Sequence, residues 1–202
     1  MKNFSNTYIF LYISILVIAV VSLLTFLTLG LKPRQEVNER ADWAMQILRA
    51  AGYKQVAANE AVQLFDQQTT VLPASDGSEA YSIRCADGSR GRVVRVDGKG
   101  LWGAIWGYVI VAEDGSTIKG VSFAHKSETP GLGANITDER FTSQFVGKQL
   151  RDMDGNFTSV RVLKKGKSPE VAEANRVDAI SGATLTSQGV DEMLLKMNLE
   201  DK

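Results

Sequence analysis

The sequence predicts an α+β fold in which helices flank an antiparallel sheet, preceded by one N-terminal transmembrane helix. Three observations lead to this fold class: one apolar segment near the N-terminus, short β-rich segments between turn residues in the middle of the chain, and amphipathic helical segments on both sides of them. The 202 residues carry 23 basic and 23 acidic side chains. This balance argues against a nucleic-acid-binding protein, because such proteins usually carry a strongly basic face.

The apolar segment runs from Tyr8 to Leu31 and contains no acidic or basic side chain. At about 1.5 Å per residue, a helix of this length is longer than the hydrocarbon core of a membrane, which is about 30 Å thick. A cleaved signal peptide is the alternative, but its apolar core is usually only about 7–15 residues long. No small-residue cleavage site follows the segment. We therefore expect residues 1–31 to form a membrane anchor, with its helix at about 8–31, and residues 32–202 to form a separate domain.

A second helix is expected directly after the anchor. Pro33 fits its first turn, and Gly52 marks its end. Apolar residues at helical spacing give this helix one buried face, which consists of Val37, Ala41, Ala44, Met45 and Leu48. The following residues 59–79 show no strong pattern, apart from a loop at Pro73 and the Asp76-Gly77-Ser78 cluster.

An antiparallel meander is predicted in the middle of the chain. Its strands are the β-rich segments at residues 92–96, 104–112 and 117–124, separated by the turn sequences Asp97-Gly98 and Asp114-Gly115. Residues 158–163 alternate as a further strand. A final helix is expected over residues 187–198, and its apolar face consists of Val190, Met193, Leu194 and Met197.

One cysteine and one histidine limit the chemistry of the chain. Cys85 cannot form an internal disulfide, a CxxC redox pair or a thiolate zinc cluster, and it most simply packs as a small buried side chain. A site with several histidine ligands is excluded in the same way. We therefore expect no metal site in this chain and a structural, hydrogen-bonded role for His125.

The segment Asp178-Ala179-Ile180-Ser181-Gly182-Ala183-Thr184-Leu185-Thr186-Ser187 combines small residues and hydroxyls ahead of the final helix. Gly182 and Ala183 allow a ligand to approach the backbone closely, and Thr186 or Ser187 suits the helix N-cap. The N–H groups of a helix N-terminus attract an anion, so a phosphate near Thr184 is physically reasonable. The simpler alternative is a capping loop without a ligand.

Two other segments carry turn signals. Glu128-Thr129-Pro130-Gly131-Leu132-Gly133 follows the strand that ends near His125, and Gly100-Leu101-Trp102-Gly103 precedes the strand at residues 104–112. Proline and glycine at this density predict a turn with backbone freedom. A structural turn is therefore the simplest interpretation of either segment alone.

The spacing Asp178-x-x-Ser181-Gly182-Ala183-Thr184 resembles the flavinylation motif of the FMN-binding domain family, which occurs in respiratory electron-transfer subunits. The segments at 128–133 and 100–103 also resemble this family, and the resemblance covers about residues 90–195. Within the family, the pattern is most similar to the subunit designated C of the Na+-translocating NADH:quinone oxidoreductase. Ala179 departs from the motif, which often has glycine at this position.

The resemblance implies that FMN is joined through its phosphate to the Thr184 hydroxyl, and that Asp178 serves recognition during attachment. Residues expected close to the phosphate are Ser181, Gly182, Ala183, Leu185 and Thr186. Polar contacts to the flavin ring or ribityl chain are expected from Glu128 and Thr129. Packing against the flavin is expected from Leu132, Gly133, Leu101 and Trp102, although Trp102, like Trp106, could also be a core residue.

The resemblance also implies a cellular setting. It suggests a single-pass protein of the bacterial inner membrane with a periplasmic flavin domain, an orientation that Lys2, Lys32 and Arg34 are too few to fix by charge. A separate, metal-dependent flavin transferase would deliver FMN from FAD. The chain would then relay electrons one at a time toward quinone as a redox subunit, together with the other membrane subunits of the reductase. Its one G-x-G-x-x-G spacing, at residues 98–103, lies between two expected strands and does not open a helix, so it is not a dinucleotide-binding fingerprint and we do not expect the chain to bind NADH itself.

Two alternatives remain open from the sequence. The subunit designated G of the Rnf electron-transport complex shares the same chemistry, and a flavin-free anchored interaction module could keep the fold with its Thr184 loop merely capping a helix. A basic run at Lys164, Lys165 and Lys167 usually means a solvated surface, with contact to a phosphate or a partner subunit as the alternative.

Overall fold

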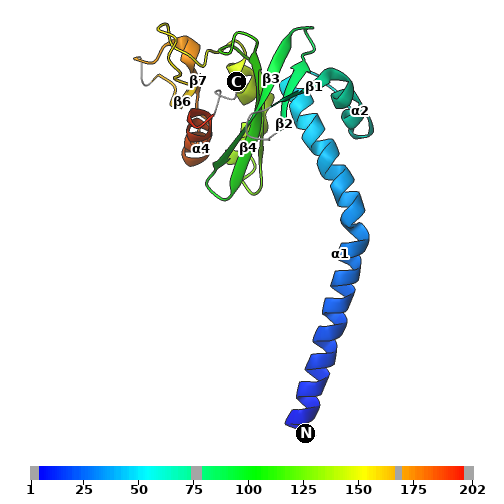
Figure 1. Ribbon diagram of the computed structural model, residues 1–202. Coiled ribbons are helices and arrows are strands. Elements are labelled where there is room, and N and C mark those ends of the chain that lie inside the picture. Colours follow the sequence, from blue (N-terminus) through cyan, green and yellow to red (C-terminus); the bar gives the residue numbers. More distant parts are fainter. Residues whose placement is uncertain (1–4, 74–78, 167–169, 198–202) are drawn as a thin grey trace. The chain divides into compact units, whose positions relative to one another are not determined.

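The computed structural model describes residues 5–73, 79–166 and 170–197, and its chain divides into two compact units, Met1–Ala41 and Asp42–Lys202. Figure 1 shows the elements in chain order. They are α1 (Asn6–Ala50), α2 (Ala58–Gln68), β1 (Thr69–Pro73), β2 (Glu79–Arg84), β3 (Arg90–Lys99), β4 (Ala104–Ala112), β5 (Ile118–His125), η1 (Gly133–Thr137), α3 (Glu139–Thr142), η2 (Ser143–Phe145), β6 (Arg161–Leu163), η3 (Glu173–Asn175), β7 (Arg176–Asp178) and α4 (Thr184–Leu195).

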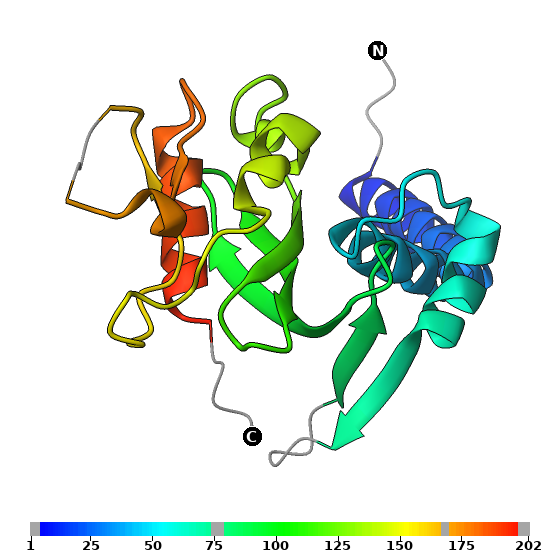
Figure 2. The ribbon, with the colours of Figure 1, turned by 90° about the horizontal axis from the view of Figure 1, so that it is seen from above.

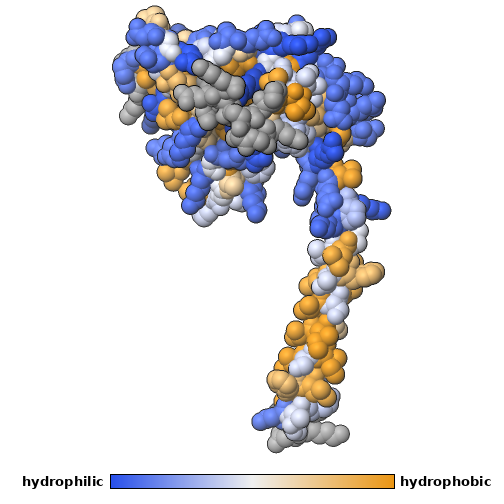
Figure 3. Space-filling view, viewed as in Figure 1, coloured by the Kyte–Doolittle hydropathy of each residue, from blue (hydrophilic) through white to orange (hydrophobic). Residues whose placement is uncertain are grey.

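The first unit consists of the greater part of α1. This helix is long and apolar enough to cross a membrane, with a mean hydropathy of 2.8 in its most apolar window. The space-filling view in Figure 3 shows apolar side chains around this part of the helix. Two of its hydroxyls are satisfied by the helix itself, since Thr25 and Thr28 donate to the carbonyls of Val21 and Leu24, each at 2.8 Å. These properties are those expected of the predicted membrane anchor.

The predicted break between the anchor and a second helix is wrong. α1 is continuous from Asn6 to Ala50, and Pro33 lies inside it rather than in a first turn. A proline in a helix has no N–H to donate, so the carbonyl four residues earlier lacks its helical hydrogen bond. The helix nevertheless continues on both sides of Pro33. The helix ends as predicted at Gly52, whose φ of +88° is the left-handed conformation of a helix C-terminus. Val37 is exposed, whereas Ala44 and Leu48 are fully buried.

The second unit contains a five-stranded antiparallel sheet in the order β1-β2-β3-β4-β5. The predicted meander is confirmed in β3, β4 and β5. Residues 59–79, which gave no strong pattern, contribute α2, β1 and the start of β2. The loop expected at residues 76–78 lies outside the described residues. Three elements, α2, β1 and β2, were therefore not predicted from the sequence.

The turn expected at Asp97-Gly98 is also wrong, because β3 continues through it to Lys99. A Cβ atom at Gly98 would lie 2.9 Å from the Cβ of Met193 in α4. This glycine therefore serves the close approach of a helix and not a change of chain direction. The actual turn lies between β3 and β4, where the N–H of Gly100 donates to the carbonyl of Gly103 at 2.8 Å.

Two apolar cores lie on opposite faces of the sheet. Alternation along β4 divides its side chains, so Val109 and Val111 belong to one core and Tyr108 and Ile110 to the other. The first core packs against α4 and the η1–η2 segment, and the second packs against α2 and residues 44–51, which include the end of α1. Figure 2 shows α4 in red on one side of the green strands and α2 in cyan on the other. The predicted fold class is confirmed.

β6 and β7 form a separate two-stranded parallel sheet. In the sequence, these two strands come after the meander and before the last helix. The strand expected at residues 158–163 is shorter than predicted and begins at Arg161. The last helix begins earlier than predicted, at Thr184, and ends at Leu195. Its predicted apolar face is confirmed, since Val190, Met193, Leu194 and Met197 are all buried, the last just after the helix.

Candidate functional site

Thr184 is the first residue of α4, and its side chain is exposed. The expected caps are wrong, because Ala183 occupies the N-cap position and no side chain caps the helix. Thr186 and Ser187 lie within the first turn and use their hydroxyls elsewhere. The Ser187 Oγ accepts the N–H of Ile180 at 3.1 Å, and this hydrogen bond fastens the loop onto the helix. The first turn also contains no acidic residue, so this helix N-terminus suits an anion.

Gly182 brings this loop against the 128–133 segment. Its φ of +81° is left-handed, and a Cβ atom there would lie 3.0 Å from Cδ2 of Leu132. A side chain at this position would therefore be strained and would crowd the neighbouring loop. The two motifs, which are separate in the sequence, are in contact in the structure.

Glu128 joins three segments at this site. Its Oε1 accepts the N–H of Trp102 at 2.8 Å, and its Oε2 accepts the hydroxyl of Thr186 in α4 at 2.6 Å. The space around the carboxylate is kept free by two glycines. A Cβ atom at Gly100 would lie 2.5 Å from Oε1, and one at Gly133 would lie 2.6 Å from the Thr186 hydroxyl. The 100–103 turn, the 128–133 loop and α4 are thus held together by one carboxylate.

The Glu128 side chain is charged at neutral pH although it is only 4% exposed. Burial raises the pKa of its carboxyl, but hydrogen bonds from the Thr186 hydroxyl and from the N–H groups of Trp102 and Gly103 lower it more, so the pKa lies below its ordinary value of 4.5. The Nδ1 of His125 accepts the N–H of Glu128 at 3.2 Å, which is the structural role expected for this histidine. The predicted contact of Glu128 with a flavin stays a prediction, and its small exposure leaves little surface for it.

Large apolar side chains are exposed on the same three segments. The exposed fractions are 47% for Leu101, 66% for Trp102, 43% for Leu132 and 56% for Leu185. Thr129 and Ser181 are exposed as well, and the carbonyl of Thr129 closes its turn by accepting the N–H groups of Leu132 and Ala134, each at 3.1 Å. Apolar side chains gathered on an exposed surface usually mark a binding site.

One predicted participant, Asp178, and the tryptophan considered as a core residue, Trp106, make other contacts. Asp178 ends β7, where its N–H donates to Oε1 of Gln144 at 2.9 Å and its exposed carboxylate lies 3.9 Å from Nζ of Lys165. Lys165 therefore pairs with Asp178, while Lys167 lies outside the described residues. Trp106 is half-buried against the second core and donates its indole N–H to Gln46 at 3.2 Å, which is the core role given as its alternative. The expected burial of Cys85 is confirmed.

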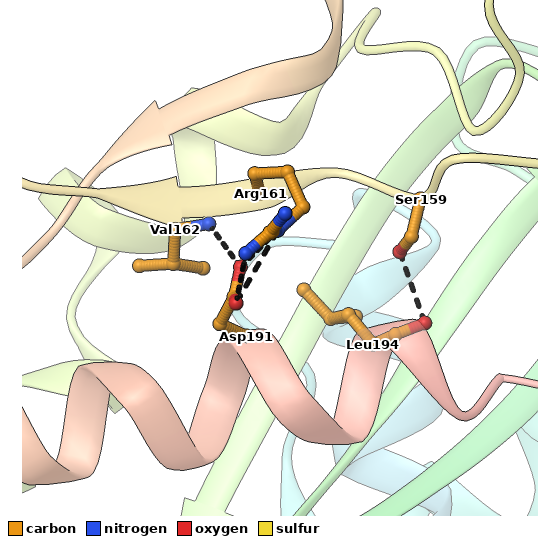
Figure 4. Close-up of polar contacts among 5 residues, drawn as sticks. All are labelled: Ser159, Arg161, Val162, Asp191 and Leu194. Carbon is orange, nitrogen blue, oxygen red and sulfur yellow. Dashed lines mark hydrogen bonds and ion pairs between the residues drawn. The ribbon is translucent and has the colours of Figure 1, made fainter. Parts of the chain in front are cut away.

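The position of α4 depends on residues that sequence reasoning missed. Gly189 faces β3, and a Cβ atom there would overlap the carbonyl oxygen of Lys99. On another side, Asp191 accepts two guanidinium N–H groups of Arg161, each at 3.0 Å, and the N–H of Val162 at 2.7 Å (Figure 4). The sequence signal that could have revealed these contacts is the presence of a glycine and an aspartate in a helix whose buried positions are otherwise mostly apolar.

Ser159 provides a further fastening of α4, also visible in Figure 4. Its buried hydroxyl donates to the carbonyl of Leu194 at 2.9 Å, and its φ of +60° is uncommon for a residue other than glycine. The same carbonyl also accepts the N–H of Met197 at 3.2 Å, so this end of the helix is held by both a backbone and a side-chain donor. Together with the contacts of Gly189 and Asp191, the Ser159 hydrogen bond fixes the helix that presents Thr184.

The chemistry of the site fits FMN. FMN has a phosphate, a polar ribityl chain and a large flat ring, and the site provides a helix N-terminus without a side-chain cap, exposed hydroxyls and exposed apolar side chains. Among the described residues, no group of three or more His, Cys, Asp or Glu side chains could hold a metal ion. The site is thus suited to an organic cofactor with an anionic end.

Comparison with known proteins supports this assignment. Residues 100–197 match the FMN-binding domain family. The subunit designated C of the Na(+)-translocating NADH-quinone reductase of Neisseria meningitidis serogroup B is 35% identical over 143 residues, which cover 70% of this chain and 54% of the relative. The corresponding subunit of Vibrio anguillarum is 37% identical over 120 residues, covering 59% and 46%. The chain thus spans about half the length of these two relatives.

Solved structures agree in fold over nearly their full length. The crystal structure of the same subunit of the Na(+)-translocating NADH-quinone reductase from Parabacteroides distasonis has a TM-score of 0.73 at 37% identity, covering 82% of this chain and 92% of that chain. Shewanella oneidensis NqrC has a TM-score of 0.63 at 28% identity, covering 78% and 90%. The chain therefore belongs to the NqrC family of Na(+)-translocating NADH-quinone reductase subunits, and its residues 100–197 form an FMN-binding domain.

Proposed function

We propose that this chain is a membrane-anchored subunit of a Na+-translocating NADH:quinone reductase, that it carries FMN on Thr184 through a phosphoester, and that it relays electrons one at a time toward quinone. The observation that carries the proposal is the position of Thr184. This residue is exposed and is the first of α4. The loop directly before it, at Gly182, contacts the exposed Leu132 of the 128–133 segment.

Attachment requires help from another protein. Within the described chain, no hydrogen bond activates the Thr184 hydroxyl, and an unassisted threonine hydroxyl is a weak nucleophile. A flavin transferase would supply the base. The Thr184 Oγ would form a bond to the phosphorus of the FMN half of FAD, the phosphoanhydride bond of FAD would break, AMP would leave, and the hydroxyl proton would pass to the transferase. The exposed carboxylate of Asp178, at the end of β7, would serve recognition by that enzyme.

FMN bound at this site supplies reversible one-electron chemistry, while the protein sets its position and surroundings. The N–H groups at the start of α4 stabilise the charge of the phosphate. Leu101, Trp102 and Leu132 would pack against the flavin ring and exclude water from it, Thr129 would offer its hydroxyl to the polar parts of the flavin, and Ser181 and Leu185 would lie close to the phosphate. The Glu128 carboxylate holds the 100–103 turn, the 128–133 loop and α4 together.

The setting of the chain is part of the proposal. Its helix of membrane-spanning length and its family support a single-pass protein of the bacterial inner membrane. We place the FMN domain on the periplasmic side and expect the other membrane subunits of the reductase as partners. FMN would exchange electrons with their cofactors.

The mass of the full chain after co-expression with a flavin transferase tests the attachment. We expect an increase of one FMN less one water, located by peptide mapping on the segment that contains Thr184. Thr184→Ala should abolish the increase, Thr184→Ser should retain part of it, and Thr70→Ala, at an exposed threonine in β1, serves as the matched control that keeps it. An unmodified mass would instead support the flavin-free interaction module, and an FMN-sized increase that survives in Thr184→Ala would refute this attachment site.

A further inference from the structure

The outer edge of β5 is open. β5 is the last strand in the sheet order, so it has a neighbouring strand on one side only. The N–H of Lys126 donates to the carbonyl of Ala104 in β4 at 3.0 Å. In an antiparallel ladder, residues alternate between the two sides, so Val121, Phe123 and His125 direct their N–H and C=O groups outward. Within the described chain, none of these groups makes a backbone hydrogen bond to another segment.

The chain itself already pairs with the beginning of this edge. The N–H of Ile118 donates to the carbonyl of Lys148, and the N–H of Gly147 donates to the carbonyl of Ile118, each at 2.8 Å. Thr117 and Gln149 form an isolated antiparallel bridge at the same place. This pairing stops before Val121. The edge can thus accept a strand, and its remaining part is left uncovered.

A cavity of about 670 Å³ lies along the open edge of β5. A smaller cavity of about 420 Å³ is lined by Asp178 and therefore belongs to the attachment motif already described. The end of α1, residues 52–55, β5 and the segment from η1 to α3 line this larger cavity. It therefore forms a groove (the β5 groove) in which an extended chain could reach the unpaired backbone groups.

The β5 groove carries a net positive charge. Its basic side chains are Arg49 and Lys54, and its acidic side chain is Glu139. The Nζ of Lys54 lies 2.7 Å from the carboxylate of Glu139, so these two charges neutralise each other. Arg49 has no acidic partner among the described residues. An extended segment with an acidic side chain would match this groove in both backbone pairing and charge.

We propose that the β5 groove binds an extended, acidic segment of another subunit of the reductase, which adds a strand to the open edge of the sheet. This inference rests on the proposed function, because that function supplies the partner. The added strand would pair with Val121, Phe123 and His125, and an acidic side chain within it would contact Arg49. The β5 groove is separate from the Thr184 site. Of the residues that form the Thr184 site or support it, only His125 also lines the groove.

Hydrogen exchange of the full chain tests the pairing, measured once alone in detergent and once in the purified complex. We expect the amides of Val121, Phe123 and His125 to exchange at least about tenfold more slowly in the complex, because exchange then requires the added strand to open. Equal exchange in both samples would overturn the proposal. Protection that appears in the chain alone and grows with its concentration would identify a second copy of this chain as the occupant and would overturn it as well.

A charge reversal tests the recognition. Arg49→Glu should lower the yield of co-purified subunits about tenfold or more, whereas the control Arg90→Glu, at an exposed arginine outside the groove, should leave it unchanged. The FMN-sized mass increase on Thr184 should persist in both variants, so a failure of flavin attachment is distinguished from a failure of docking. The inference is wrong if Arg49→Glu and Arg90→Glu give the same yield.

Discussion

Replacing Glu128 by alanine tests whether one carboxylate holds the candidate site together. The substitution removes the acceptor of two hydrogen bonds, from the Thr186 hydroxyl and from the N–H of Trp102, and it removes the carboxylate whose charge the N–H of Gly103 also stabilises. A hydrogen bond to a charged group contributes about 1.5–3 kcal/mol, and a buried donor left without a partner costs about 1–3 kcal/mol. These contributions are not additive, because the loops can relax and water can enter. We therefore expect the 100–103 turn to be held less tightly by about 2–4 kcal/mol.

Hydrogen exchange at the amides of Trp102 and Gly103 measures this quantity directly. A loss of about 2–4 kcal/mol corresponds to exchange that is about 30-fold to 1000-fold faster when exchange follows local opening. Glu128→Gln should have a smaller effect of about 1 kcal/mol, because the amide keeps one oxygen for the backbone N–H groups and the Thr186 hydroxyl can turn to accept. The control is Glu113→Ala, at an exposed glutamate in the turn after β4. Unchanged exchange at Trp102 and Gly103 in Glu128→Ala would show that packing, and not the carboxylate, holds the turn.

The other predictions concern the helix that presents Thr184 and the response to acid. Gly189→Ala should lower the free energy of unfolding by about 1–3 kcal/mol, because the new methyl group overlaps the backbone of β3. Thermal unfolding followed by circular dichroism measures this loss, and the control Gln188→Ala, at an exposed position, should not show it. Asp191→Ala should cost about 2–3 kcal/mol in the same assay, since Arg161 and the N–H of Val162 lose their acceptor, and a cost no greater than that of the exposed control Glu192→Ala would contradict the role drawn in Figure 4. The pKa of Glu128 is lower in the folded protein than its ordinary value of 4.5, so its stabilisation is complete above pH 4.5 and is lost as the pH falls through the lowered pKa. The protection factor of the Trp102 amide should therefore fall in this acidic range in the wild-type protein, and an equal fall in Glu128→Gln would rule out Glu128 as its cause.

Local patterns identified the elements whose formation depends on neighbouring residues. The apolar segment gave the part of α1 that is long and apolar enough to cross a membrane, the β-rich segment at Ala104–Ala112 gave β4 with its observed bounds, and the helical spacing of Val190, Met193 and Leu194 gave the buried face of α4. In each case the signal is a side-chain period of 2.0 or 3.6 residues, or a long uncharged segment, and the backbone responds to it locally.

The same local reasoning failed where a distant partner decides the conformation. Asp97-Gly98 has the composition of a turn, yet β3 continues through it because the glycine lies beneath Met193 of α4. β1 and β2 lack a strong alternation and depend on pairing within the sheet. Pro33 is favoured at a helix start and disfavoured in a helix interior, yet it lies inside α1, which continues on both sides of it.

The sequence by itself determined the segment that is long and apolar enough to cross a membrane, the resemblance of the Thr184 loop to a flavinylation motif, and the two other motif segments that lie beside this loop. Only the tertiary structure decided how these residues act together. The hydrogen bonds from Trp102 and Thr186 to Glu128 span 26 and 58 residues of sequence, and no local period encodes such separations. They form because sheet pairing and the close approach of α4 to β3 bring the segments within hydrogen-bonding distance. Burial then makes the shared carboxylate the group on which their arrangement depends.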